Sequence, residues 1–291
     1  MNAILSPRIG VLALLAIATT FGSNHIAARI AFDHGTSVTS AVAIRSGFTA
    51  LFLLVLLRIA RVPLGLPRAT LTRALAIGLL VALQSFCLYS AVALMPVALA
   101  LLAFNTFPIL LALLSWATGA GPPRGVAVIA MPLALIGLAL ALDVFGKPVS
   151  PPGIAWAFGA AVSFALTLLV IARWLNNVDG RLRTFLTMSV TAIVVFAAGF
   201  AGDAFALPRA PAGWLGLALL TVFYGVAITS LFIVLPLLGS ATYAVVLNFE
   251  PIAVLFLAWM ILGQSISPLQ MAGAFLVIGA ITLTAIRGAR R

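Results

Sequence analysis

The chain has 291 residues, 64% of them hydrophobic and 7% charged, and 16 basic against 5 acidic residues give a net charge of +11. Soluble domains carry about 25% charged residues, so this composition excludes a water-soluble fold and indicates a membrane protein whose surface faces lipid. The basic residues lie between apolar runs, as topology signals and lipid-headgroup contacts do, so we expect membrane lipid and no nucleic acid as a partner.

Apolar runs separated by charged or Pro/Gly-rich breaks predict ten transmembrane helices. Each is long enough to cross about 30 Å of hydrocarbon, and none alternates as a barrel strand would. The first run continues to Ile30, so we interpret it as an uncleaved helix and not as a signal peptide. The predicted helices cover 9–31, 38–59, 72–94, 97–118, 125–143, 152–174, 183–202, 213–235, 240–262 and 267–286.

The basic residues set the predicted orientation. With both termini in the cytoplasm, Arg29, Lys147 and Arg209 fall near the outer face, Arg45 lies within a helix and every other basic residue lies inside. That bias fits the positive-inside rule, whereas an odd number of spans would put the C-terminal arginines outside. We therefore predict a multi-pass protein of a bacterial inner membrane with both termini cytoplasmic.

One segment of the chain is repeated. Asn105, Pro108, Ile109, Leu114 and Trp116 recur 143 positions later as Asn248, Pro251, Ile252, Leu257 and Trp259. Five helices per half is an odd number, so the second half must enter the membrane from the opposite side. The sequence predicts an all-α fold of two inverted five-helix repeats, 1–147 and 148–291.

The chain resembles the EamA-type members of the drug/metabolite transporter superfamily. The resemblance rests on FGSNHIAARI in the first helix, Arg45 in the second, and the run from Leu247 to Leu283 that covers the ninth and tenth. Gln264 departs from the family, in which many relatives have Glu. The resemblance implies an exporter of small metabolites, and the chain looks most like YddG-type aromatic amino-acid exporters.

Glu250, the only glutamate, is predicted near the middle of the ninth span. A carboxylate at the bilayer centre costs about 2.5–3.5 kcal/mol on insertion scales and is expected to face the bundle interior. It is either half of an ion pair, for which Arg45 is the expected partner, or a substrate-ammonium contact or proton carrier. His25 is a second candidate proton carrier, with simple packing as the alternative.

The repeated Asn-x-x-Pro segment predicts a helix break beside a polar site. Pro108 and Pro251 each deprive the carbonyl four residues earlier of its donor, and Asn105 and Asn248 lie a turn away. These residues form either a hinge with a substrate site or interhelical hydrogen bonds that hold the bundle. The further candidates for a substrate cavity are Asn24, Gln84, Tyr89 and Tyr224.

These residues favour a secondary transporter that exports amino acids or similar metabolites by alternating access around a central cavity. Other metabolites or drugs such as amines and nucleosides, and a channel or lipid-translocating protein, are the alternatives. The sequence has no G-x-S-x-G or P-loop motif and no cluster of metal ligands, so we expect no enzyme activity, ATP site, metal or other cofactor. It does not distinguish a monomer from a homodimer.

Overall fold

The computed structural model describes residues 7–120, 126–141, 150–175, 178–237, 246–247 and 249–288, and every regular element in these ranges is a helix. The predicted boundary between residues 147 and 148 lies outside the described residues, as does Asn248. The all-α prediction is confirmed for the described part of the chain.

The first half contains six helices and a short π-helical turn. They are α1 (Pro7–Asp33), α2 (Val38–Ile59), α3 (Arg68–Leu94), α4 (Val97–Phe104), α5 (Phe107–Ser115), the turn η1 (Trp116–Ala120) and α6 (Val126–Ala141). Ser37 caps α2 by accepting a hydrogen bond from the Ser40 amide, and Pro67 and Pro96 precede α3 and α4, where a missing N–H costs nothing.

The second half contains α7 (Pro151–Trp174), α8 (Gly180–Ala201), α9 (Pro211–Leu237), α10 (Glu250–Leu262) and α11 (Pro268–Gly288). Ser150 and Asp179 cap α7 and α8 with their side chains, and Gly263 ends α10 with a φ of 62°, a conformation that glycine adopts without steric cost. α3 and α9 begin and end at positions that differ by the offset of the sequence repeat.

Seven segments are long and apolar enough to cross a membrane, and the fourth of these, Val97–Gly119, is broken into α4 and α5. Shorter apolar helices occur at Met131–Ala141, Glu250–Leu262 and Pro268–Ala280. They fall in the fifth, ninth and tenth predicted spans. Every predicted span thus contains helix in the described residues, although only seven have spanning length there.

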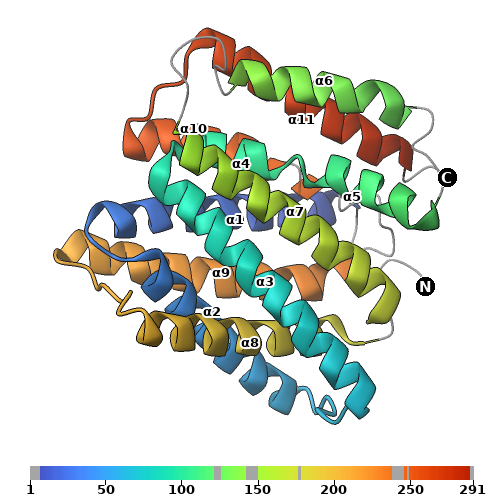
Figure 1. Ribbon diagram of the computed structural model, residues 1–291, viewed down its shortest axis with the longest axis vertical. Coiled ribbons are helices and arrows are strands. Elements are labelled where there is room, and N and C mark those ends of the chain that lie inside the picture. The colour runs from blue at the N-terminus through green and yellow to red at the C-terminus, as the bar shows by residue number, and fades with distance from the viewer. Residues whose placement is uncertain are drawn as a thin grey trace.

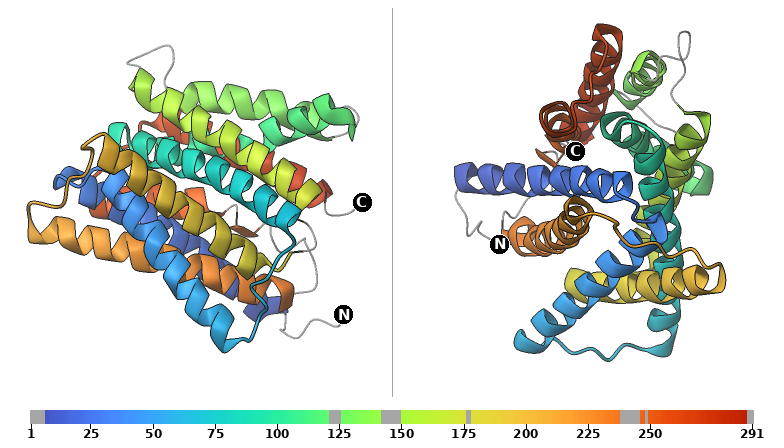
Figure 2. Two further views of the ribbon diagram at one scale, coloured as in Figure 1. Left: turned by 60° about the horizontal axis from the view of Figure 1, so that its bottom comes forward. Right: turned by 90° about the vertical axis from the view of Figure 1, so that its left-hand side faces the viewer.

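The main helix pairs follow the symmetry of the repeat. α1 lies on α9 and, equivalently, α7 lies on α3, while α2 pairs with its own counterpart α8 and α6 with its counterpart α11. Figure 1 shows the α6–α11 pair at one edge of the molecule and the α2–α8 pair at the opposite edge, with the remaining helices between them. The right-hand view of Figure 2 shows the same separation. The packing therefore has the symmetry of a duplicated unit.

Counterpart helices run in opposite directions. Thr39 near the start of α2 lies against Gly199 near the end of α8, whereas Gly47 further along α2 faces Ala192. Similarly, Gly137 of α6 lies against Gly273 of α11, where a Cβ on Gly137 would be 2.8 Å from the Gly273 carbonyl oxygen. The two halves are consequently related by a rotation that reverses the direction of each helix.

α4 is the most deeply packed segment, with each residue from Val97 to Ala103 buried, whereas only Ile109 is buried in α5. The first amide of α4, on Val97, donates to the Gln264 side-chain oxygen at 3.1 Å, and Gln264 belongs to the loop between α10 and α11. Arg29 of α1 donates to the carbonyls of Val92 and Met95 at the end of α3. Side chains from distant segments thus satisfy the backbone where α3 gives way to α4.

Candidate functional site

A cavity of about 290 Å³ lies between the two halves. Pockets for small molecules have volumes of about 300–1,000 Å³, so this cavity fits a small ligand. Its lining comes from α1, α2, α3, α7, α9, α10 and both ends of the break between α4 and α5. The lining residues are Phe21, His25, Arg45, Gln84, Ser85, Leu88, Tyr89, Phe104, Asn105, Phe107, Phe164, Tyr224, Ile228, Leu231, Leu247 and Glu250.

Much of this lining is duplicated. Five pairs of lining residues stand at equivalent positions of the two repeats: Phe21 and Phe164, Ser85 and Ile228, Leu88 and Leu231, Phe104 and Leu247, and Phe107 and Glu250. The cavity therefore lies at the interface of the repeats, which is where transporters built from inverted repeats bind substrate.

The ionisable groups break this symmetry. The counterparts of His25, Arg45 and Glu250 are Leu168, Met188 and Phe107, which carry no charge. Since equivalent helices pack with apolar side chains at these positions, the packing of the repeat does not require a charge at any of them. The charged groups of the cavity are therefore among the residues that distinguish one half from the other.

Glu250 is paired with His25. The His25 Nε2 atom lies 3.4 Å from a Glu250 carboxylate oxygen, and the His25 Nδ1 atom is buried without a hydrogen-bond partner. Glu250 is the first residue of α10, and the positive end of the helix dipole stabilises a negative charge there. The expected ion pair of Glu250 with Arg45 does not form, because Arg45 is held by aromatic rings instead.

Arg45 is 2% exposed, and its guanidinium carbon lies 3.8 Å from the centre of the Tyr224 ring and 5.0 Å from that of Tyr89. One terminal nitrogen donates to the Ser85 hydroxyl at 3.1 Å. The Nε atom is buried and has no hydrogen-bond partner. Arg45 therefore enters the cavity as a cation held by two aromatic faces and one hydroxyl.

The predicted cavity residues are largely brought together. Gln84, Tyr89, Asn105 and Tyr224 line the cavity, whereas Asn24 lies behind it. Asn24 is fully buried and its side-chain oxygen accepts a hydrogen bond from the Tyr89 hydroxyl at 2.9 Å. Asn24 thus fixes the orientation of Tyr89, and its place behind the wall corrects the expectation that it would line the cavity.

The predicted helix break occurs at the cavity wall. α4 ends at Phe104, and α5 begins at Phe107, one residue before Pro108. α10 begins at the equivalent residue, Glu250, one residue before Pro251. The Asn105 amide nitrogen donates to the Leu101 carbonyl oxygen at 2.7 Å, so this side chain caps its own helix. Both prolines thus begin a helix whose first turn reaches the cavity.

The phenylalanine residues on the wall were not predicted as site residues. Phe104 and Phe107 pack against Phe164 with ring centroids 5.4 Å and 4.7 Å away. Phenylalanine is common throughout an apolar chain, so composition does not mark these residues. The duplication of Phe21 as Phe164 at the offset of the repeat was the signal that could have identified this pair.

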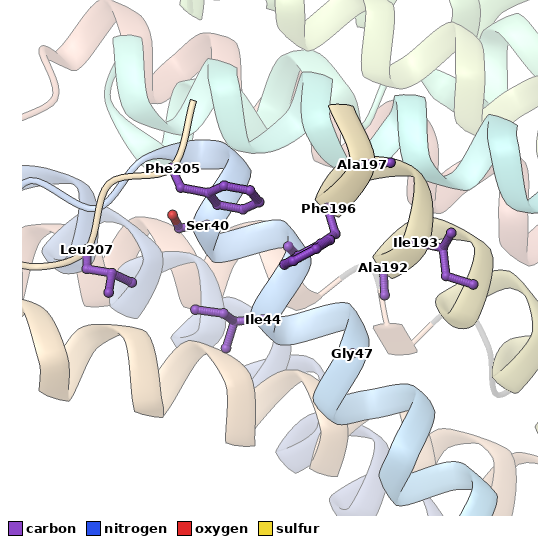
Figure 3. A pocket seen from close by; sticks show the side chains of 10 residues that line it. Ser40, Ile44, Gly47, Ala192, Ile193, Phe196, Ala197, Phe205 and Leu207 are labelled. Atoms are coloured by element: carbon purple, nitrogen blue, oxygen red, sulfur yellow. The ribbon is translucent and has the colours of Figure 1, made fainter. Parts of the chain in front are cut away.

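A larger hollow of about 670 Å³ lies between α2 and α8. Figure 3 shows the side chains of Ile44, Phe196, Phe205 and Leu207 around it, with Ser40 as its one hydroxyl. The Ser40 hydroxyl already accepts hydrogen bonds from Ser37 and from the Ala206 amide. We therefore place the candidate site in the smaller cavity, because a hollow without free polar groups offers only hydrophobic contact.

The profile of the EamA-like transporter family matches the chain twice, over residues 8–142 and 151–286. The chain belongs to the EamA-like transporter family. A solved crystal structure, described only as "Crystal structure of protein", is similar with a TM-score of 0.68 and 17% sequence identity, over 98% of this chain and 100% of that chain. At this identity the likeness concerns the fold alone, and no curated protein matches the chain.

Membership of the EamA-like family makes this chain a multi-pass membrane protein with two copies of a transporter repeat. Each match covers one set of helices, α1 to α6 and then α7 to α11. The cavity described above is therefore the space that the two EamA repeats enclose together.

Proposed function

We propose that this EamA-like protein is a secondary transporter that exports small polar metabolites across a bacterial inner membrane by alternating access around the central cavity. The observation that carries the proposal is the cavity itself, because equivalent residues of the two repeats wall it and three unmatched ionisable residues lie in it. Amino acids, including aromatic and other neutral ones, are the favoured substrates.

The proposed arrangement has ten spans, cytoplasmic termini and inverted repeats divided near residues 147 and 148. The antiparallel packing of α2 on α8 and of α6 on α11 supports the inversion, since a two-fold axis in the membrane plane reverses each helix. Such an axis exchanges the inner and outer faces, so one cavity can open to each in turn.

The cavity chemistry supports a polar substrate with an apolar part. A carboxylate and a cation stand at its wall, with Gln84 and Ser85 as uncharged polar groups and Phe21, Phe104, Phe107 and Phe164 as aromatic ones. An amino acid presents a complementary charge to each ionic group. We propose that the chain has no catalytic activity, no ATP site and no cofactor, and that it works as a monomer or a homodimer.

Counterflow into proteoliposomes tests the carrier function. Purified protein is reconstituted, loaded with unlabelled compound and offered radiolabelled amino acids, amines and nucleosides. A carrier gives saturable and stereoselective exchange, and the exchanged compounds define its substrates. Flux that neither saturates nor exchanges would reject the carrier in favour of a channel or lipid-translocating protein.

The His25–Glu250 pair is where we propose coupling to protons, because an imidazole and a carboxylate, both able to exchange a proton, lie 3.4 Å apart at the cavity wall. Wild-type transport should then respond to an imposed pH gradient and transport by Glu250→Gln should not. Equal transport by both proteins with and without the gradient would remove the coupling proposal and leave facilitated exchange.

A further inference from the structure

Arg45 is a buried cation without a buried acid as its partner. Within the described ranges, ion pairs join Arg29 to Asp33 and Arg181 to Asp179, the His25 imidazole contacts Glu250, and none of these contacts includes Arg45. Burial of a charge is costly unless it is paired, and the rings of Tyr224 and Tyr89 replace only part of the lost hydration. The cavity thus holds a cation that forms no ion pair with an acid among the described residues.

The fold does not account for this charge. Met188 occupies the position of Arg45 in the second repeat, on α8, and it is also 2% exposed. An uncharged side chain therefore satisfies the packing at the equivalent place of the α2–α8 pair. What Arg45 adds to the cavity is a charge and a set of hydrogen-bond donors, including the unpartnered Nε atom.

We propose that Arg45 binds the carboxylate of the transported substrate, an inference that rests on the proposed function and specifies its substrates as carboxylate-bearing compounds. A guanidinium presents parallel N–H groups that fit a carboxylate in a bidentate manner. The Nε atom is free for such a bond, and one terminal nitrogen is held by Ser85. The guanidinium carbon lies over the rings of Tyr224 and Tyr89, which hold the cation at the cavity wall.

Glu250 then takes the ammonium, which an α-amino acid carries on the same carbon as its carboxylate. The Tyr89 ring lies beside both Arg45 and His25, the partner of Glu250, because its centre is 5.0 Å from the Arg45 guanidinium carbon and 5.9 Å from the His25 ring centre. His25 pairs with Glu250 in this structure and has to release it when a substrate ammonium arrives. A zwitterion satisfies Arg45 and Glu250 together without changing the net charge of the cavity.

The test compares substrates that differ in one charged group. The aromatic set is L-phenylalanine, phenethylamine, which lacks the carboxylate, and 3-phenylpropionate, which lacks the amine. L-leucine, isoamylamine and 4-methylpentanoate form the aliphatic set. Dissociation constants are measured with purified full-length wild type, Arg45→Gln, Arg45→Lys and Glu250→Gln, and counterflow is measured in parallel.

The wild type should bind the amino acid of at least one set at least about tenfold more tightly than the matching amine. Arg45→Gln should weaken binding of the amino acid and of the acid by at least about tenfold and leave the amine nearly unchanged. Arg45→Lys should restore part of the lost affinity. Glu250→Gln should weaken binding of the amino acid and of the amine and leave binding of the acid nearly unchanged.

Equal wild-type affinity for amino acid and amine in both sets would overturn the inference, and that comparison requires no variant to fold. An equal loss of all three compounds in folded Arg45→Gln would also overturn it, since it would assign Arg45 a structural role. If amines exchange in liposomes and carboxylates do not, the carrier function is supported and the role of Arg45 in binding carboxylates is rejected. If nothing exchanges but the binding constants follow the expected pattern, the role of Arg45 in binding carboxylates is supported and the carrier function is rejected.

Discussion

The guanidinium carbon of Arg45 lies 3.8 Å from the centre of the Tyr224 ring, so a cation from the first repeat rests on an aromatic face from the second. The residue equivalent to Tyr224 in the first repeat is Val81, which provides no such surface. The contact joins α2 to α9 across the interface of the halves, and it holds the guanidinium beside the cavity.

Replacing Tyr224 by Leu should therefore lower stability by about 1–2 kcal/mol, because a desolvated cation–π contact is lost. Tyr224→Phe keeps the aromatic face and should change stability by less than about 0.5 kcal/mol. Thermal unfolding of the purified proteins in detergent measures both. Equal unfolding temperatures for the Leu and Phe variants would show that the ring contributes only volume.

The Asn24–Tyr89 hydrogen bond should couple the two residues energetically. Asn24→Ala leaves the buried Tyr89 hydroxyl without its acceptor, and Tyr89→Phe removes that hydroxyl. A double-mutant cycle on unfolding free energy should give a coupling of about 1 kcal/mol. Asn24→Asp, which keeps an acceptor oxygen, is the matched control. A coupling near zero would mean that Tyr89 is oriented by packing alone.

The break between α4 and α5 should govern turnover more than binding. Pro108→Ala restores the amide that can bond the Phe104 carbonyl, which favours one continuous helix from α4 into α5. We expect transport to lose about tenfold in maximal rate with its Km changed less than about threefold. Pro132→Ala in α6 is the control, since Pro132 lies inside an uninterrupted helix away from the cavity. A hinge role is contradicted if both variants have the same maximal rate.

Close packing of α6 on α11 should make Gly273 intolerant of a side chain. A Cβ there would meet the backbone of Gly137 and Ala141, whereas a Cβ on Gly279 of the same helix meets nothing within 4 Å. Gly273→Val should cost more than about 3 kcal/mol, and Gly279→Val should be nearly neutral. The yield of monodisperse protein in size-exclusion chromatography compares them. Similar yields would show that the α6–α11 contact is not needed for folding.

Asp179, which lies outside the membrane-spanning segments, makes a pH-dependent contribution to the stability of the folded protein. Its pKa is lowered by the hydrogen bond from the Arg181 side chain, with backbone donors at the start of α8 adding to the effect. Its stabilising effect is therefore present above the ordinary carboxyl pKa of about 3.9 and is lost as the pH falls through the lower native pKa. Both side chains are about one-third exposed, so we expect under about 1 kcal/mol.

The Asp179→Asn variant tests this contribution, because it keeps the capping oxygen and removes the charge. Its unfolding temperature should lie slightly below that of the wild type near pH 7, and the two should converge as the pH approaches 3. A gap that stays constant with pH would assign the effect to capping geometry and not to the charge.

The helices and the break at Asn105 to Pro108 could be predicted from the sequence, because length, hydropathy and proline act locally. Gln84, Tyr89, Tyr224 and Glu250 line one cavity. This too could be predicted, because exposing a polar side chain to lipid costs free energy and such residues therefore face the interior of the bundle. The partners of Glu250 and Arg45 could not be predicted. Both partners depend on side-chain directions and on how far α1 and α9 lie from α2, which the sequences of the single helices do not specify.

Gln264 has a consequence for how the chain is made. The first amide of α4 in the first half donates to a side chain that follows α10 in the second. During synthesis α4 reaches the membrane long before Gln264 leaves the ribosome, so its leading amide needs a temporary acceptor, such as water or a lipid headgroup. The start of α4 therefore reaches its final hydrogen bonding only after Gln264 has been translated.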